Sequence, residues 1–158
     1  KIKRRLELSE NQPSKKKSNN GTQELFDLDA KQIERIAKGL ERFELEKGYI
    51  NTGLSLKSLA TSMDTNSSYL SKYINAIKGV NFSRYVNTLR IHSIMEVLQV
   101  NSKIRSYTID AIAEEAGFSN TRSFSNHFKR VTGINPSYFL KKLQKDLDAS
   151  GAPEPQTV

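Results

Sequence analysis

A chain of 158 residues is long enough for one ordinary domain with a hydrophobic core and polar tails. It contains no cysteine, which excludes disulfides and thiolate metal sites, and its two histidines, His92 and His127, are too far apart in sequence to suggest a histidine-based metal cluster. No run of about 18 apolar residues could span a membrane, and the net charge of +8 indicates a polyanionic partner, either nucleic acid or an anionic membrane surface.

The positive charge lies in the body of the chain as well as in its first residues. Residues 54–107 carry seven Lys/Arg against two acids, and residues 108–145 carry six against three. Residues 1–27 contain the basic runs Lys3-Arg4-Arg5 and Lys15-Lys16-Lys17 without apolar periodicity, so we expect a flexible basic arm or linker there, and a disordered tail over 146–158. The chain starts at Lys1 with no signal-peptide pattern, and we expect it to be part of a longer protein.

Between residues 28 and 145 the local signals predict helices throughout. The first helix starts at Asp29, which forms a capping-box pattern with Gln32, and Gly48 is expected to close it. A long helix is expected from about 81 to 100. Further starts are expected at Ser55, near Asn66, after Thr108, near Ser119 or Asn120, and at Asn135-Pro136. Because no stretch alternates with period two, the predicted fold class is all-α.

Two segments of the chain, residues 55–85 and 108–139, are versions of one another. With a shift of 53, Leu56, Leu59 and Ala60 match Ile109, Ile112 and Ala113. One extra residue then enters the second copy near Gly117, and with a shift of 54 the match continues. The pairs after the insertion are Leu70 with Phe124, Ser71 with Ser125, Ile74 with Phe128, Gly79 with Gly133, and Tyr85 with Phe139. A kept apolar pattern with a changed polar face predicts a duplicated scaffold that presents two different surfaces.

Each copy has the layout of a helix-turn-helix, with a short helix, a tight turn and a second helix rich in small polar and basic side chains. In the second copy Gly117 permits the turn, and Ser119-Asn120 cap the helix that follows. Short hydrogen-bonding groups can approach base edges closely, and cations can pair with guanine or phosphate. The two second helices therefore indicate binding to double-stranded DNA.

Several segments of the chain are similar, in the same order, to segments of a known protein family. They are Ser55-Leu56-Lys57-Ser58-Leu59-Ala60, Ser68-Tyr69-Leu70-Ser71-Lys72-Tyr73-Ile74, Tyr85-Val86-Asn87-Thr88-Leu89-Arg90-Ile91, Ile109-Asp110-Ala111-Ile112-Ala113-Glu114-Glu115-Ala116-Gly117-Phe118-Ser119, Ser123-Phe124-Ser125-Asn126-His127-Phe128-Lys129-Arg130-Val131-Thr132-Gly133 and Asn135-Pro136-Ser137-Tyr138-Phe139. On these residues the chain resembles the DNA-binding domain of the AraC/XylS family of bacterial transcription regulators, over about residues 29–145.

The resemblance implies about seven helices in residues 28–145, arranged as two helix-turn-helix subdomains joined by a long linker helix. The first unit is expected at about 54–80, the linker helix at about 81–100 and the second unit at about 108–133. Both second helices, the recognition helices, would enter successive major-groove segments on one face of the duplex.

The resemblance also implies a cytoplasmic transcription regulator. As an activator it would contact RNA polymerase, and the sequence leaves the choice between activator and repressor open. The sensor part would lie outside this chain, and a homodimer would form through a region outside it. Some members of the family have a membrane-anchored sensor and a basic arm before the DNA-binding part. On that pattern residues 1–27 would lie next to the inner membrane in the parent protein.

The first unit departs from the usual family pattern in two places. Met63-Asp64-Thr65 stands where a glycine-containing turn is common, and Asn75-Ala76-Ile77-Lys78 is less basic than usual. We expect both changes to leave the fold intact and to affect the contact register of the first recognition helix.

The candidate DNA-contacting residues follow from helix geometry and from the resemblance. They are Ser67, Ser68, Ser71, Lys72 and Asn75 in the first recognition helix, and Asn120, Thr121, Arg122, Ser125, Asn126 and Lys129 in the second. Arg122 suits a bidentate guanine contact, Asn126 an adenine contact, and Lys72 and Lys129 phosphate contacts. The alternative for each is an ordinary solvated helix face. His127 is interpreted as a packing residue, and Tyr73, Tyr85, Phe118, Phe128 and Phe139 as core.

Three other functions compete with DNA recognition. An enzyme is disfavoured because the eight glycines occur singly at turns and neither histidine has a carboxylate partner at helical spacing. RNA binding is disfavoured because the aromatic platforms that stack single-stranded bases are absent. A helical protein-interaction module without specific DNA binding is the main alternative. No cofactor, metal or small-molecule site is predicted.

Overall fold

The structure, a computed structural model, describes residues 28–151, and every regular element in that range is helical. In chain order the elements are α2 (Ala30–Leu45), the 3-10 turn η1 (Gly48–Ile50), α3 (Leu56–Ser62), α4 (Ser67–Lys78), α5 (Phe82–Val100), α6 (Ser102–Arg105), α7 (Ile109–Glu115), α8 (Thr121–Thr132) and α9 (Pro136–Ser150). The all-α prediction is confirmed. The predicted arm over 1–27 and the last part of the predicted tail, 152–158, lie outside the described residues.

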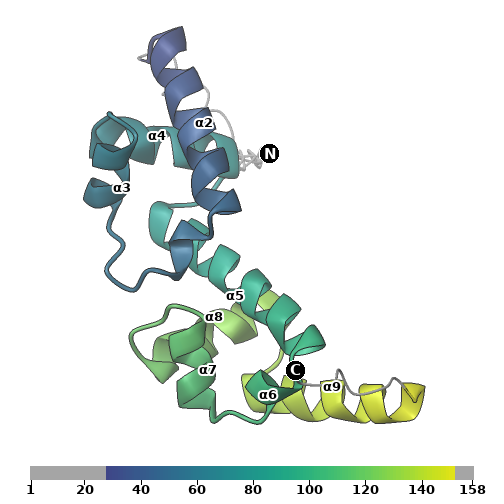
Figure 1. Cartoon of the computed structure of the whole chain (residues 1–158). Coiled ribbons are helices and arrows are strands. Elements are labelled where there is room, and N and C mark those ends of the chain that lie inside the picture. The colour runs from purple at the N-terminus through teal and green to yellow at the C-terminus, as the bar shows by residue number, and fades with distance from the viewer. Residues whose placement is uncertain (1–27, 152–158) are drawn as a thin grey trace, which may run out of the picture.

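Two helical groups lie at the two ends of α5 (Figure 1). The helices α2, α3 and α4 surround the first part of α5, and α6 to α9 surround its second part. This is the predicted arrangement of two helix-turn-helix subdomains joined by one long helix. Among the helices of the described range, none is long and apolar enough to cross a membrane.

Short polar side chains start the helices where the sequence predicts them. The Ser55 hydroxyl oxygen accepts from the Ser58 N–H, and the Ser58 hydroxyl oxygen accepts from the Ser55 N–H, which completes a capping box. At the other predicted starts, the caps that accept an N–H three residues ahead are Asp29, Asn66, Asn81, Thr108 and Asn120. Each satisfies one backbone donor that the first helical turn leaves without a partner, which stabilises the helix by about 1 kcal/mol.

The predicted end of the first helix is wrong. Helix α2 ends at Leu45, and Lys47, not Gly48, takes the left-handed conformation, with φ of 53°. Gly48 starts η1 instead. A Cβ placed on Gly48 would lie 2.6 Å from Cδ2 of Phe43, so glycine is needed there for close packing and not for helix termination.

Helix α6 was not predicted, and α9 runs further than predicted. Asn101 ends α5 and also caps α6, and Arg105 holds the corner by donating from Nη1 to the carbonyls of Leu98 and Gln99. Helix α9 continues to Ser150, so residues 146–150 are helical and are not part of a disordered tail. No helix breaker precedes Gly151, which takes the left-handed C-cap with φ of 59°, and Gln144 bonds Asp148 one turn on.

The apolar residues form two separate cores, and α5 contributes to both. Tyr85 and Val86 pack with α2, η1, α3 and α4, whereas Ile91, Ile94 and Leu98 pack with α6, α7 and α8. The aromatic residues predicted as core are buried or, in the case of Phe139, packed against the second core. Each fully buried Leu, Ile or Phe contributes roughly 1.5–3 kcal/mol.

Helix α2 and η1 lie outside the repeat, and polar contacts tie α2 to the first unit. From here on the first unit includes α2 and η1, and the second unit includes α6, α9 and the end of α5 packed against them. The Glu44 carboxylate accepts from Lys78 Nζ at 2.9 Å and from the Tyr85 hydroxyl at 2.6 Å. Burial raises the pKa of Glu44, but these two donors outweigh it, and the net pKa is lowered. These bonds join α2 to α4 and α5.

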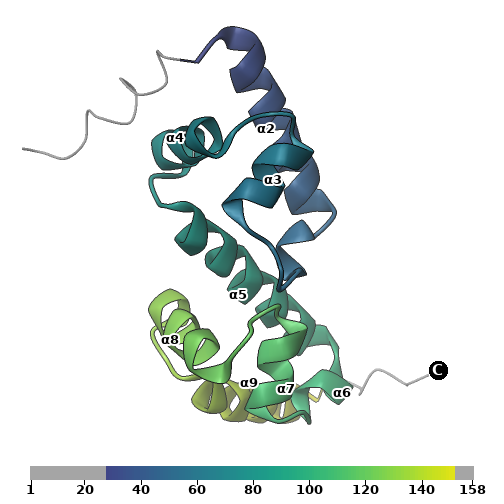
Figure 2. The ribbon, with the colours of Figure 1, turned by 90° about the vertical axis from the view of Figure 1, so that its left-hand side faces the viewer.

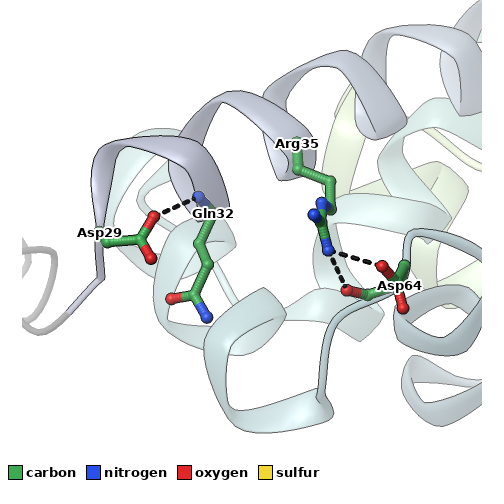
Figure 3. A network of polar contacts seen from close by, with 4 residues as sticks. All are labelled: Asp29, Gln32, Arg35 and Asp64. Atoms are coloured by element: carbon green, nitrogen blue, oxygen red, sulfur yellow. Dashed lines mark hydrogen bonds and ion pairs between the residues drawn. The ribbon is translucent and has the colours of Figure 1, made fainter.

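The two turns of the repeat are built alike with different residues. Asp64 has φ of 52° and Gly117 has φ of 85°, at matching positions. The next residue donates its N–H to the same helix position in both copies, Thr65 to Ala60 and Phe118 to Ala113. Aspartate tolerates the left-handed region better than most residues. Arg35 of α2 holds it there, because Arg35 Nη1 donates to the Asp64 carbonyl at 2.9 Å and to its carboxylate at 2.7 Å (Figure 3).

Gly117 also makes a close approach to the first unit, and this generates a stability prediction. A Cβ on Gly117 would lie 2.4 Å from the Ile50 carbonyl oxygen. Gly133, with φ of 82°, has open space around it. We expect Gly133→Ala to cost roughly 1–2 kcal/mol from its left-handed backbone alone. Gly117→Ala should cost roughly 1–3 kcal/mol more, because the methyl group also forces the units apart. Urea unfolding of both variants measures the difference, and equal losses would contradict the close approach.

Candidate nucleic-acid interface

The two predicted recognition helices, α4 and α8, lie on the same side of the molecule. Figure 2 shows them one above the other along the left-hand edge, with α6 on the opposite side. Each follows its short partner helix, α3 or α7, through the tight turn just described. The arrangement allows two helices to approach one face of a long ligand together.

Neither α4 nor α8 contains an acidic residue. Their buried faces are apolar, with Leu70, Tyr73 and Ile74 in α4 and Phe124 and Phe128 in α8. Apart from the exposed Ile77 near the end of α4, the outward faces carry mainly polar and cationic side chains, a surface suited to an anion.

The predicted contact residues of α4 lie away from its core face. Ser68 and Asn75 are exposed, and Ser67, Ser71 and Lys72 are half-buried. Serine hydroxyls and an amide can each donate and accept, so this face can bond base edges or phosphate oxygens.

The predicted contact residues of α8 are placed similarly, with two qualifications. Arg122, Asn126 and Lys129 are exposed, and Ser125 is half-buried. The remaining two have bonds within the second unit. Asn120 is exposed, but its Oδ1 accepts the N–H of Ser123 as the helix cap, and the Thr121 hydroxyl bonds the Asp110 carboxylate. Part of the hydrogen-bonding capacity of Asn120 and Thr121 is thus used inside the protein.

The outward positions of the two helices carry different chemistry. With the repeat shift of 54, the serine at 68 corresponds to Arg122, and the asparagine at 75 corresponds to Lys129. Helix α8 therefore presents more positive charge than α4, and the two helices cannot present the same hydrogen-bonding pattern.

A polar cluster that sequence reasoning missed lies between the two units, and we call it the Arg90 cluster (Arg90, Asn87 and His127). Arg90 of α5 donates from Nε to the Tyr49 carbonyl at 2.6 Å and from Nη2 to the Asn51 carbonyl at 2.9 Å. Its Nη1 donates to Asn87 Oδ1 at 3.1 Å, and the guanidinium lies 5.5 Å from the centroid of the Phe118 ring. The sequence signal that could have found it is Asn87 and Arg90, two polar residues about one turn apart between the apolar positions of α5.

His127 joins the second unit to this cluster. Its Nε2 lies 3.1 Å from Asn87 Nδ2. Because Asn87 Oδ1 already accepts from Arg90, Nδ2 is the donor and Nε2 accepts, which requires a neutral imidazole. Burial, and then the nearby charges of Arg130 and Arg90, lower the pKa of His127. The half-buried ring also packs against Phe118, which agrees with the packing role expected from the sequence.

Comparison with known families and proteins gives a consistent picture. A family model described as a helix-turn-helix domain, of AraC type, matches residues 59–142. The uncharacterised transcriptional regulatory protein YesN of Bacillus subtilis is 38% identical over 94 residues, which are 58% of this chain and 25% of YesN. The raffinose operon regulatory protein RafR of Pediococcus pentosaceus is 25% identical over 110 residues, 67% of this chain and 38% of RafR. The chain thus spans between a quarter and two fifths of the length of these relatives.

Solved structures share the fold. The DNA-binding domain of AdpA, solved with a target DNA, has a TM-score of 0.60 at 15% identity and covers 70% of this chain and 94% of its own. The C-terminal domain of the response regulator yesN from Fusobacterium nucleatum has a TM-score of 0.55 at 26% identity, covering 66% and 97%. The C-terminal domain of AraT, a response regulator from Geobacillus stearothermophilus, has a TM-score of 0.58 at 23% identity, covering 68% and 84%.

The lowered pKa of His127 predicts a pH dependence of stability. At a pH between the ordinary histidine pKa of about 6.5 and the lower folded-state pKa of His127, this histidine is protonated in the unfolded chain and neutral in the folded chain. The free energy of unfolding should therefore fall as the pH is lowered through this window. His127→Gln should flatten the profile between about pH 7 and 5, above the range in which carboxylates titrate. Urea titrations at several pH values measure this, with His92→Gln, outside the cluster, as the control. The same flattening in both variants would contradict the assignment.

Proposed function

This chain belongs to the AraC-type helix-turn-helix family of DNA-binding transcription regulators, and we propose that it reads an operator with α4 and α8 in successive major-groove segments. The main support is the position of two acid-free recognition helices on one side of the molecule, with short polar and cationic side chains outward. Major grooves that face one side of B-DNA repeat every ~34 Å, so two linked helices can read two blocks of one site.

Within this proposal the contact residues have separate tasks. Arg122 reads guanine, Asn126 reads adenine, and Lys72 and Lys129 bind phosphates. Ser67, Ser68, Ser71, Asn75 and Ser125 make shorter polar contacts, and Asn120 and Thr121 contribute only the groups left by their bonds inside the protein. Base contacts would set the sequence preference, whereas the lysines would set affinity and its dependence on salt.

We extend the proposal to the whole regulator. The chain would be the output part of a longer protein, which is supported by the 25% and 38% of relatives' length that it spans. We propose contact with RNA polymerase and a homodimer formed outside this chain. The basic runs Lys3-Arg4-Arg5 and Lys15-Lys16-Lys17 support an arm next to the inner membrane. Sedimentation of the chain with anionic but not neutral vesicles would test this arm.

Selection of binding sites from a random duplex library tests the central proposal. We expect an enriched motif of two short blocks about one helical turn apart. Tight binding without a motif would mean that the domain coats DNA without reading it. No binding at low salt would favour the protein-interaction alternative.

Removing Arg122 should relax specificity at one position. Arg122→Ala is expected to lose roughly 1–3 kcal/mol of discrimination at a single guanine and to leave the other positions unchanged. Affinities for all single-base variants of the selected site measure this. Unchanged discrimination at every position would remove Arg122 from the readout.

Removing Lys129 should act differently, on every sequence alike. Lys129→Ala is expected to weaken specific and non-specific duplexes by similar factors and to reduce the slope of log K against log salt by about 0.9. Lys103→Ala is the matched control, because Lys103 is an exposed lysine on α6, opposite α4 and α8. An equal change of slope in both variants would rule out a local phosphate contact.

A further inference from the structure

Within residues 28–151 the buried apolar residues of the two units form two separate clusters and no shared core. The cluster around α2, α3 and α4 and the cluster around α7 and α8 are separate, and α5 is the element that runs through both. A cleft of about 170 Å³ lies between them, lined from the first unit by Leu54 and from the second by Phe118, Ser119 and Ser123. Apolar packing therefore joins the units through α5, and contacts outside the two cores are needed to restrain rotation between them.

The Arg90 cluster bridges this gap with directional bonds. One side chain reaches two carbonyls of the first unit, Tyr49 and Asn51, and stacks on Phe118 of the second. Asn87 continues the network to His127 on α8, the second recognition helix. A planar guanidinium that bonds in three directions fixes orientation better than a flexible point charge. The backbone approach of Ile50 to Gly117 sets the distance at the same place.

We propose that the Arg90 cluster fixes the angle between α4 and α8 and so makes the chain selective for the spacing between the two blocks of its site. This rests on the proposed two-block reading. A rotation of roughly 10° over half of the ~34 Å between the grooves moves a recognition helix by about 3 Å, close to the ~3.4 Å rise of one base pair. To hold the register within one base pair, the cluster has to restrict this rotation to less than about 10°.

The test compares Arg90→Gln with Arg105→Gln. Arg105 is also a partly buried arginine that donates to two backbone carbonyls, but both lie at the end of α5 within the second unit. Arg105→Gln should therefore destabilise the chain without changing the angle between the units. Arg90→Lys, which keeps the cation but loses the fork, serves as a milder second variant.

The first readout is affinity for the selected site with one base pair added to or removed from the spacer. We expect wild type and Arg105→Gln to lose about tenfold or more, because misplacing one helix removes at least one good base contact. For Arg90→Gln, the affinity should differ by less than about threefold between the selected and the altered spacers. The loss of affinity in Arg90→Lys should lie between those of wild type and Arg90→Gln. Wild-type spacing preference in Arg90→Gln would overturn the proposal.

The second readout needs no DNA. The chain has no cysteine, so a spin-label pair can be placed on Glu41→Cys in α2 and Lys142→Cys in α9, both at exposed positions. We expect a narrow distance distribution in wild type and Arg105→Gln and a broad one in Arg90→Gln. A narrow distribution in Arg90→Gln, or equal broadening in Arg105→Gln, would overturn the orienting role. If selection returns no two-block motif, the proposed function fails, and these distances still decide whether the cluster holds the angle.

Discussion

The division of α5 between two cores is the constraint on which the rest of the structure depends. Tyr85 and Val86, in its first turns, pack in the core of one unit. Ile91, Ile94 and Leu98, in its later turns, pack in the core of the other. Because the helix is continuous, neither unit can shift along it without exposing apolar surface in its own core. The helix therefore fixes the separation of the units, and only rotation or bending remains for other contacts to restrain. Asn87 and Arg90 lie where the residues of the first core along α5 give way to those of the second.

The helix starts could be predicted from the sequence because capping is local. A cap needs only a serine, threonine, asparagine or aspartate and an N–H three residues ahead, so Ser55, Asn66 and Thr108 show their role without tertiary context. The end of α2 could not be predicted in this way. Gly48 looks like a terminator, but its task is to lie against Phe43, a contact that only the folded chain reveals.

The same distinction applies to the interface. The repeat predicts which positions of α4 and α8 face outward, because a kept apolar stripe marks the opposite face in both copies. The repeat does not reveal that Thr121 bonds Asp110, because an alignment of the two copies carries no information about which side chains pair with each other. Two of the partners of Arg90 are backbone carbonyls at residues 49 and 51, about forty residues earlier, and backbone groups leave no signature in side-chain patterns.

Because the turns at Asp64 and Gly117 have different surroundings, the two copies of the repeat cannot exchange places in the chain. Asp64 depends on Arg35, which belongs to a helix that precedes only the first copy, whereas position 117 has no room for any side chain beside Ile50. A chain with its halves exchanged would place a carboxylate side chain against a backbone carbonyl and leave an arginine facing a glycine. The two copies are thus complementary parts, and a chimaera with another protein of this fold would have to receive both units together with the helix that joins them.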